Sequence, residues 1–374
     1  MLKGFYLSLM IGPTIPVLAP QPVIDALQGA QITTSAGQAS GFQLTFALSK
    51  NSILNTALIP AGFFDPGIRV ILMATINSLP TVLMDGIITQ QSVAPSSEPG
   101  QSTFSVTGQD LTVLMDLNDN YTNGWKAVPV YGIVNLIILQ YVIYGLVPAV
   151  IPPIEEITDA PTQSWGSQVG SDLKYINQLA RESGYVFYLD PGPLPGASIA
   201  YFGPEIRVGV PQPALNINMD ADTNVESLSF TYDGMSRDQI SINILDPITN
   251  SFAIPIPIPN VSLLRPPLVV KQASALHNVS LPDTADLDPV RAALLGLAAS
   301  VTPDPITATG QLDVLRYGQP LKARQLVGVR GSGMAYDGLY YVTSVTHNIK
   351  RGEYKQSFNL AREGLISITP KVVP

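Results

Sequence analysis

Apolar and polar residues alternate through much of the first hundred residues. Apolar side chains occupy every second position from Phe5 to Ile11 and again from Phe42 to Leu48, which is the period of a strand that buries one face. Three further segments have the length and apolar content of strands, namely 69–77, 82–91 and 102–107. Because Gly, Pro and polar residues separate these short segments, the region is predicted to form a β-barrel or a β-sandwich.

The pattern changes between residues 111 and 202. The uncharged segment 130–144 predicts a buried helix that ends at Gly145, and 171–184 predicts an amphipathic helix with Ser171 as its N-cap and Gly184 at its end. Around these helices we expect a short helix at 111–117, a polar turn at 118–124, and strands at 147–151, 185–189 and 198–202. This region is therefore predicted to be a small α/β unit between two β regions.

Strand-like alternation returns after residue 225. The predicted strands are 225–232, 239–245, 325–330, 338–349 and 354–360. Residues 254–259 alternate Ile and Pro, and since proline donates no backbone hydrogen bond, this segment cannot be a central strand. Asp288 and Pro289 predict the start of a helix at 291–300. No tandem repeat is visible in the sequence.

The last two predicted strands form a hairpin with its turn at 350–353. We expect one face of this hairpin to carry the bulky side chains of Tyr341, Val345, Ile349, Tyr354, Phe358 and Leu360. His347 lies in the same strand pattern, and we expect it to have a structural role. The C-terminal strands are thus predicted to bury a large apolar surface.

Composition adds a constraint to this β-rich pattern. Hydrophobic residues make up 46 % of the 374 residues and charged residues only 13 %, about half of the roughly 25 % typical of globular proteins. This balance excludes a disordered chain, and 30 Gly and 33 Pro argue against a helical bundle. The absence of cysteine excludes disulfide and Cys-ligated zinc scaffolds. So little charge indicates surface that is buried against other chains.

Charge is also unevenly distributed. The net charge of −8 argues against a nucleic-acid-binding protein. Residues 321–374 are nevertheless basic, which is consistent with either a solvated strand face or a contact with an acidic neighbour. The uncharged segment 127–154 is long enough to span a membrane, but its predicted helix of about 22 Å is shorter than the ~30 Å hydrocarbon core. We therefore predict a buried helix rather than a membrane span.

Candidate catalytic chemistry is sparse. The histidines are His277 and His347, and no nucleotide-binding or serine-hydrolase motif is present. The carboxylates that could pair in a cell-wall polysaccharide hydrolase are Glu155, Glu156, Asp283, Asp286 and Asp288. Because these acids lie in predicted loops or helix caps, the sequence assigns no catalytic, cofactor-binding or metal-binding residue. A carbohydrate-binding adhesin is a further alternative for a β-rich chain of this kind.

The order of short motifs along the chain resembles the phage late control protein D family. The motifs are Asp85-Gly86-Ile87-Ile88, Val106–Asp110, Asp172–Gly184, Tyr185–Tyr188, Tyr201–Pro204, Gly310–Asp313, Arg316–Gly318, Gly338–His347, Gly352–Tyr354, Phe358 and Ala361-Arg362. Each motif is short, and their order and spacing over nearly the whole chain carry the resemblance. This family contains baseplate hub proteins of contractile phage tails and contractile injection systems, and it is similar to the hub part of type VI secretion spike proteins.

The resemblance implies a structural, non-enzymatic hub that forms a homotrimer. Each subunit would contribute two tube-like β-barrels, so that three copies make a pseudo-sixfold ring between a sixfold inner tube protein and a separate, threefold spike protein. Other baseplate proteins would be further partners, and no nucleic-acid binding, cofactor or metal is expected. Assembly would take place in the bacterial cytoplasm, and the product would be part of a virion tail or an injection-system particle.

The expected fold class is therefore β-rich α+β, with two tube-like β-barrel domains, a small inserted α/β domain and a further small helical or extended segment. The first barrel is expected in 1–115, with 203–235 as a segment that could complete it, and the inserted α/β domain in 116–202. Residues 203–320 would form a second β region with the Pro-rich arm and a helix. Residues 321–374 would supply the C-terminal strands that complete the second barrel.

Overall fold

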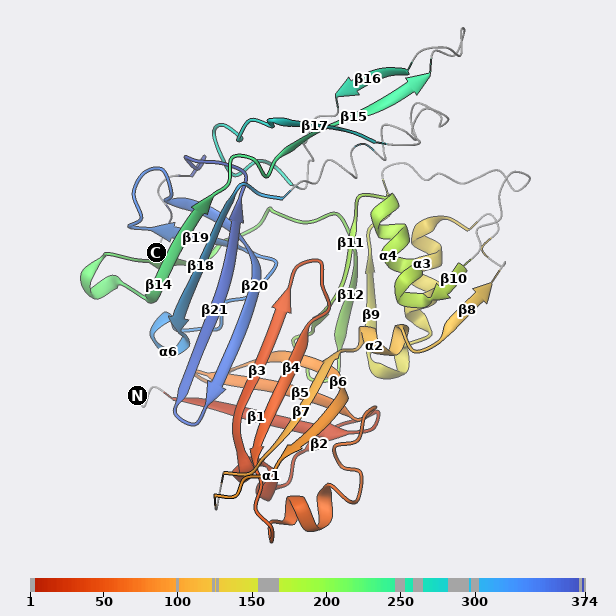
Figure 1. Cartoon of the computed structure of the whole chain (residues 1–374), viewed down its shortest axis with the longest axis vertical. Coiled ribbons are helices and arrows are strands. Elements are labelled where there is room, and N and C mark those ends of the chain that lie inside the picture. Colours follow the sequence, from red (N-terminus) through yellow and green to blue (C-terminus); the bar gives the residue numbers. More distant parts are fainter. Residues whose placement is uncertain are drawn as a thin grey trace.

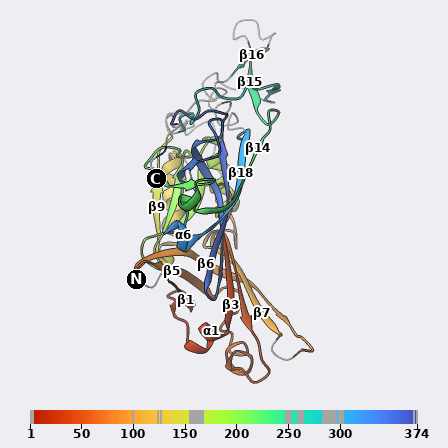
Figure 2. The same ribbon diagram turned by 90° about the vertical axis from the view of Figure 1, so that its left-hand side faces the viewer.

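The computed structural model gives an elongated, β-rich molecule with a small α/β unit on one side and an arm at one end (Figure 1, Figure 2). The structure describes residues 4–98, 101–122, 125, 128–153, 168–245, 253–257, 265–281, 296, 303–369 and 372. Strands predominate over helices throughout these residues. The β-rich α+β class predicted from the sequence is confirmed.

The first half of the chain builds two layers of strands. Its elements are β1 (Phe5–Gly12), β2 (Val17–Leu18), α1 (Gln21–Ala26), β3 (Leu27–Ser35), β4 (Gly41–Ala47), η1 (Leu54–Leu58), β5 (Arg69–Ile76), β6 (Leu79–Ala94) and β7 (Thr103–Asp110). Strands β3, β4 and β7 lie side by side, while β1 and β5 run across them (Figure 1). Leu9 and Leu72 from the crossing strands meet Leu44 and Val106 between the layers, and all four are at most 1 % exposed.

The second half continues the same sheet. Its elements are β13 (Gln212–Asn216), η3 (Asp220–Asp222), β14 (Val225–Tyr232), β18 (Ile306–Asp313), α6 (Val314–Tyr317), β19 (Leu326–Arg330), β20 (Gly338–Lys350) and β21 (Glu353–Arg362). The strands predicted in this half are confirmed, with ends that differ by no more than two residues. Ser344–Lys350 of β20 pairs with β3, which gives the continuous order β14-β18-β21-β20-β3-β4-β7-β6-β5-β1-β2.

The two halves of the sheet repeat the same order of elements. Repeat 1, made of β3, β4, η1, β5, β6 and β7, corresponds to repeat 2, made of β14, β18, α6, β19, β20 and β21. The first hairpin of each repeat has a bulge at the same place, at Leu27–Gly29 and at Val225–Ser227. The last hairpin of each repeat also has a bulge, at Thr89 and at Thr343, and both threonine hydroxyls donate to a carbonyl of the opposite strand. This repeat is not visible in the sequence, because the two halves have the same strand pairing but different residues at most equivalent positions.

Glycines of the motifs make room for aromatic rings in both repeats. A Cβ on Gly108 would lie 2.4 Å from the ring of Phe42 on the neighbouring strand and 2.3 Å from the carbonyl oxygen of Ile87. A Cβ on Gly310 would lie 2.5 Å from the ring of Phe358. Since real Cβ atoms do not approach so closely, only glycine fits at these two positions, and packing explains both.

The α/β unit has a core of its own. Its elements are α2 (Thr112–Met115), β8 (Asp119–Thr122), α3 (Val130–Leu139), η2 (Val142–Tyr144), β9 (Leu146–Val150), β10 (Gln168–Ser171), α4 (Asp172–Glu182), β11 (Val186–Pro191) and β12 (Ser198–Gly203). Ile137, Ile176 and Phe202 are fully buried between α3, α4 and the strands. The hydroxyl of Ser171 accepts from the backbone N–H of Lys174, as the predicted N-cap should. The predicted helix 130–144 is shorter than expected, because its last turn is the separate helix η2.

The predicted polar turn at 118–124 is wrong in part, because residues 119–122 form β8. This strand pairs with β10 in front of a buried carboxylate, that of Asp172, which is 2 % exposed. Asn120 and Gln168 donate to one oxygen of Asp172 at 2.7 Å and 2.6 Å, and the Tyr141 hydroxyl donates to the other at 2.7 Å. Asn120, one of the polar residues that suggested a turn, is therefore a hydrogen-bond donor to a buried acid.

A buried ion pair fastens the α/β unit to repeat 1. Arg69 of β5 donates to both carboxylate oxygens of Asp85 at 2.7 Å, and the two side chains are 3 % and 1 % exposed. From the α/β unit, the Ser198 hydroxyl donates to Asp85, and the carbonyls of Tyr144 and Gly196 accept from Arg69. The acid of the Asp85-Gly86 motif thus lies at the contact between the two parts.

The predicted face of the C-terminal hairpin is wrong at one residue. Val345, Ile349, Tyr354, Phe358 and Leu360 lie in the main core as expected. Tyr341 does not, because the bulge at Thr343 shifts the alternation of side chains by one position. Val342 consequently faces the core, and Tyr341 packs on the opposite side with Leu268 and Leu326.

Two tube-like β-barrel domains were expected, and the strands of the described residues form no closed barrel. Their pairing is an open path from β14 to β2, and one apolar core contains residues of both repeats. The reason is the edge-to-edge pairing of β20 with β3, which joins the repeats into one ladder where each would otherwise need to close on itself.

The arm is a small sheet inserted between β14 and β18. It consists of β15 (Asp238–Leu245), β16 (Ala253–Pro257) and β17 (His277–Ser280), and it extends beyond the end of repeat 2 (Figure 2). The part of the Ile-Pro segment that the structure describes belongs to β16, which pairs with β15 alone. As predicted, it is not a central strand. The helix predicted at 291–300 falls almost entirely outside the described residues.

Candidate functional site

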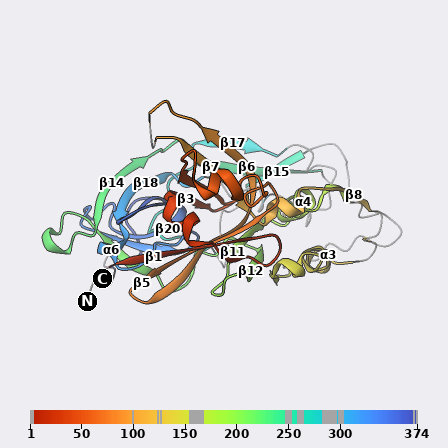
Figure 3. The ribbon, with the colours of Figure 1, turned by 90° about the horizontal axis from the view of Figure 1, so that it is seen from below.

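One face of the eight adjacent strands from β14 to β6 is polar and uncharged. Every second side chain points away from the core, since strand side chains alternate between the two faces. Ala47, Ala94 and Ala361 occupy some of these outward positions. The uncharged polar side chains among them are Gln31, Thr33, Ser35, Gln43, Thr45, Ser92, Ser105, Thr107, Gln109, Ser227, Ser229, Thr231, Thr307, Thr309, Gln311, Ser344, Thr346, Asn348, Ser357 and Asn359. All are Ser, Thr, Asn or Gln, and we call this surface the hydroxyl–amide face. The crossing strands β1 and β5 lie on the other side of the sheet (Figure 3).

Hydrogen bonds within the hydroxyl–amide face link neighbouring strands. The hydroxyl oxygens of Thr33 and Thr346 are 3.0 Å apart across the junction of the two repeats. Asn359 donates to the hydroxyl of Ser344 at 2.8 Å. Charge enters towards the β20–β21 turn, where Lys355 of β21 pairs with Glu353 of the same strand and with Glu226 of β14. The face is therefore polar and hydrogen-bonded between its ends, and charges lie near the β20–β21 turn.

Two strand edges of the sheet have no partner among the described residues. β14 pairs with β18 on one side only, and β6 beyond Ile88 pairs with β7 on one side only. Val93 and Tyr232 on these edges are 50 % and 46 % exposed. Because an open edge presents unpaired N–H and C=O groups, each edge is ready to accept another strand.

Exposed apolar side chains accompany the β6 edge. Ile15, Val17 and Leu18 are 82 %, 63 % and 68 % exposed on and beside β2. β2 pairs with the end of β1, and this end of β1 pairs with the start of β5. The start of β5 pairs in turn with the part of β6 just before its open edge begins. Apolar groups next to an open edge are typical of an interaction surface.

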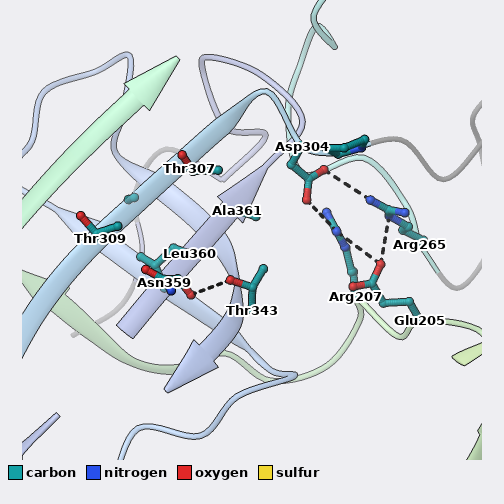
Figure 4. Close-up of a pocket in the computed structure, with 12 residues that line it drawn as sticks. Glu205, Arg207, Arg265, Asp304, Thr307, Thr309, Thr343, Asn359, Leu360 and Ala361 are labelled. Atoms are coloured by element: carbon teal, nitrogen blue, oxygen red, sulfur yellow. Dashed lines mark hydrogen bonds and ion pairs between the residues drawn. The ribbon is translucent and has the colours of Figure 1, made fainter. Parts of the chain in front are cut away.

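An ion cluster lies at the arm end of the hydroxyl–amide face (Figure 4). Arg207 contacts the carboxylates of Asp304 at 2.7 Å, Glu363 at 2.9 Å and Glu205 at 3.3 Å. Arg265 contacts the same Asp304 and Glu205 at 3.3 Å and 3.4 Å. Burial alone would lower the pKa of Arg207, but the surrounding carboxylates raise it. The cluster therefore ties the base of the arm to the segments that precede β13 and follow β21.

A cavity of about 550 Å³ opens beside this cluster. Its lining combines the arginines and acids with Thr307, Thr309 and Asn359 of the hydroxyl–amide face (Figure 4). Each acid of the cluster is paired with an arginine. The charged residues that line the cavity thus form ion pairs that hold neighbouring segments of the chain together.

His347 is a buried, neutral member of the core, in agreement with its predicted structural role. Its side chain is 5 % exposed, and the imidazole Nδ1 lies 2.7 Å from the Tyr354 hydroxyl and 3.2 Å from the amide of Gln356. Burial lowers the pKa of His347 to about 4. The other histidine, His277, is exposed and lies 3.1 Å from Asp238.

His347 is expected to make the folded protein less stable as the pH decreases. Between pH 6.5 and 4 the unfolded chain binds a proton that the folded chain does not, so the free energy of unfolding decreases by roughly 3 kcal/mol across this window. Urea unfolding at several pH values should show this slope, and His347→Gln should remove it. His277→Asn is the matched control and should keep the slope. An unchanged slope in His347→Gln would contradict the assignment.

The acids proposed for a hydrolase, Glu155, Glu156, Asp283, Asp286 and Asp288, lie outside the described residues. Within the described part of the chain, no group of three or more metal-ligating side chains could hold a metal ion. None of the helices that the structure describes is long and apolar enough to cross a membrane. The feature that the sequence reasoning missed is the hydroxyl–amide face, whose signal was the absence of charge at the polar positions of the alternating segments.

Comparison with solved structures shows where this fold occurs. A tail protein from Neisseria meningitidis superposes with a TM-score of 0.61 at 15 % identity over 97 % of this chain and 98 % of its own. The 43 kDa tail protein of prophage MuSo2 from Shewanella oneidensis gives 0.62 at 16 % identity over 96 % and 99 %. A component of the type VI secretion system from E. coli gives 0.51 at 12 % identity over 92 % and 77 %.

No protein-family model and no curated protein sequence matches the chain. The structural matches extend over nearly the full length of both chains for the two tail proteins, so they include both repeats and the α/β unit. The resemblance inferred from the sequence motifs is therefore confirmed at the level of structure. The chain has the fold of these phage tail proteins and of the type VI secretion component.

Proposed function

We propose that the chain is a structural, non-enzymatic hub of a phage tail or contractile injection system. It forms a homotrimer that joins an inner tube protein to a separate spike protein and contacts other baseplate proteins. The observation that carries this proposal is the internal repeat with one open edge at each end. The fold shared with phage tail and type VI secretion proteins supports it.

The junction between the two repeats is a template for contact between copies. In the junction, β20 pairs with β3, and Thr346 lies opposite Thr33. The correspondence of the repeats equates Thr346 with Ser92 of β6 and Thr33 with Thr231 of β14. If β6 of one copy pairs with β14 of the next, both open edges acquire partners in the register already used inside the chain. Such a head-to-tail contact can close into a ring, and three copies would supply six repeats.

The hydroxyl–amide face would line the channel of this ring. The other side of the sheet carries the core and the crossing strands β1 and β5. In a closed ring, only the outside has room for this second layer. The inner surface is then the thin, polar side of the sheet.

The two ends of the ring would have different symmetry. At one end both repeats finish in short reverse connections, between β6 and β7 and between β20 and β21 (Figure 1). At the other end the repeats differ, since only repeat 2 carries the arm and only repeat 1 leads into the α/β unit. We therefore place the sixfold inner tube at the end with the short connections and the threefold spike at the arm end.

The domain boundaries follow from the same proposal. Residues 1–115 contain repeat 1 and its crossing strands, and 116–202 contain most of the α/β unit. Residues 203–320 and 321–374 together form repeat 2 and its arm. We assign 203–235 to repeat 2, because β13 pairs with β19 and β14 pairs with β18.

Engineered disulfides test the ring directly, because the native chain has no cysteine. Ser92→Cys with Thr231→Cys places one thiol on each open edge, at positions equivalent to Thr346 and Thr33, whose hydroxyls are 3.0 Å apart. Oxidation of this double variant is expected to give a covalent species of three chains as its largest product. Non-reducing gels and light scattering measure it.

Two matched controls accompany this variant. Thr33→Cys with Thr346→Cys should cross-link within one chain and leave the mass of a monomer. Ser92→Cys with Ser229→Cys is two residues out of register and should not cross-link, because the Cα atoms would be too far apart for a disulfide. Monomers alone from the Ser92/Thr231 variant, under conditions where the Thr33/Thr346 control is oxidised, would overturn the proposed ring.

A further inference from the structure

The cavity of about 550 Å³ beside the ion cluster combines a floor that both repeats have with a wall at the base of the arm. The floor is the hydroxyl–amide face of β18 and β21, where Thr309 and Asn359 are exposed. These positions correspond to Gln43 and Thr107 of repeat 1. The wall is the ion cluster, and among the described residues only repeat 2 carries an arm. A cavity with this wall therefore occurs once per chain and three times in a ring of three chains.

The position of the cavity limits what can reach it. Its floor belongs to the face that lines the channel of the proposed ring, and its wall stands at the arm end of this face (Figure 4). A molecule that fills the cavity therefore approaches from inside the ring, at its arm end. A threefold partner on the ring axis meets three identical cavities there, whereas a sixfold partner finds a match in only half of the repeats.

The wall of the cavity is held in place by its own contacts. The side chains of Arg207 and Asp304 are 3 % and 6 % exposed and lie 2.7 Å apart. The Arg207 guanidinium also lies 4.8 Å from the ring centroid of Tyr341, which is buried. Because these side chains are ordered before a partner arrives, little conformational entropy is lost at the wall on binding. The volume of the cavity is within the roughly 300–1,000 Å³ of pockets that bind ligands.

The lining of the cavity is polar but has no net charge. Arg207 and Arg265 are balanced by Glu205 and Asp304, and these four side chains form ion pairs with one another. The hydroxyls and the amide of the floor can both donate and accept hydrogen bonds. A charged group that enters the cavity loses water and finds no unpaired opposite charge, which costs free energy. Backbone amides and uncharged polar side chains find hydrogen-bond partners there without this cost.

We propose that each cavity receives an uncharged, polar segment of the spike protein, so that three copies of one segment hold the spike at the arm end of the ring. This inference rests on the proposed ring and names the surface by which the ring binds the spike. Three features carry it, namely a wall that occurs once per chain, a floor that faces the channel, and a lining without net charge.

Filling the cavity with uncharged side chains tests the proposal. Thr309→Tyr with Asn359→Tyr places two bulky phenol groups on the floor of each cavity. The dissociation constant of the purified trimer for the spike protein of the parent particle is expected to rise about tenfold or more, because the phenol groups occupy the space of the segment. Gln43→Tyr with Thr107→Tyr is the matched control, since it makes the same change at the equivalent positions of repeat 1. This control should bind the spike protein as tightly as the native trimer does.

The Ser92/Thr231 cysteine pair, introduced into the native chain and into both Tyr variants, separates this inference from the proposed ring. If no trimer is cross-linked even in the native background, the proposed function fails and this inference fails with it. With intact trimers, native affinity in the Thr309/Asn359 variant would overturn this inference alone. Equal losses of affinity in both Tyr variants would also overturn it, because the cavity would then not be the site.

Photo-cross-linking gives a second measurement that does not depend on a loss of binding. The probe p-benzoylphenylalanine, placed at Thr309 of the otherwise native chain, should form a covalent link to the spike protein on irradiation. Mass spectrometry should identify the linked segment as one without charged residues, and the same probe at Gln43 should give much less product. No link from Thr309 to the spike protein, a link to a charged segment, or a link only to another hub chain would overturn the proposal.

Discussion

Arg69→Met is expected to lower the free energy of unfolding by about 3–5 kcal/mol, because it leaves the buried carboxylate of Asp85 without its counter-charge. Asp85 is 1 % exposed and accepts from two nitrogens of Arg69 at 2.7 Å. Arg69 also donates to the carbonyls of Tyr144 and Gly196 in the α/β unit, so the same change loosens that contact. Urea unfolding of the purified variant measures the loss.

The double variant Arg69→Met with Asp85→Leu is the matched control. Removing both charges also removes the unpaired carboxylate, so it should recover a large part of the stability that Arg69→Met loses. The hydroxyl of Ser198, which donates to Asp85, then loses its acceptor and limits the recovery. A single variant as stable as the native chain would show that the pair is not the fastening between repeat 1 and the α/β unit.

Local patterns in the sequence were sufficient to predict an element wherever its own residues determine its secondary structure. Alternation located most of the strands, and the cap at Ser171 placed the start of α4 correctly. The left-handed Gly145 ends the short helix η2 rather than α3. The strand β3 was missed because its residues, from Leu27 to Ser35, include few large apolar side chains. Its place is fixed by two neighbours, β4 and β20, which are far apart in the sequence.

Properties that depend on register were beyond reach of the sequence. The bulge at Thr343 reverses the side chains before it, and no residue type announces such an insertion. The internal repeat is equally hidden, since Thr33 and Thr231 correspond while most of their neighbours do not. β8 was misread because its polar residues suit a turn, whereas they pair with β10 and Asn120 donates to the buried carboxylate of Asp172.

The low charge of the chain can now be assigned to particular surfaces of the fold. The sequence suggested surface hidden between subunits, and the structure shows that the eight central strands have an uncharged outer face as well as an apolar inner one. Two surfaces of one large sheet therefore account for much of the missing charge. The motif residues Gly108 and Gly310 belong to the same sheet, and each leaves room for the aromatic side chain of a Phe on the neighbouring strand.

Phe358→Asp is expected to abolish the folded protein. Phe358 is 2 % exposed in the core that both repeats share, and its ring lies against the position where Gly310 lacks a side chain. The change leaves a cavity, which costs about 3–5 kcal/mol for the loss of a buried Phe ring, and adds the cost of a buried, unpaired carboxylate. The sum is comparable with the stability of roughly 5–15 kcal/mol of a typical domain, so no soluble protein should be obtained.

Two variants make this expectation specific. Phe358→Leu keeps an apolar side chain and should remain soluble with a lower melting temperature. The sequence placed Tyr341 on the same face as Phe358, but Tyr341 lies on the other side of the bulge, with the Arg207 guanidinium 4.8 Å from its ring. An aspartate there has a positive neighbour, so its loss should be smaller. Soluble yield and thermal unfolding compare the three variants, and a Tyr341→Asp variant less stable than Phe358→Asp would refute the assignment of the two faces.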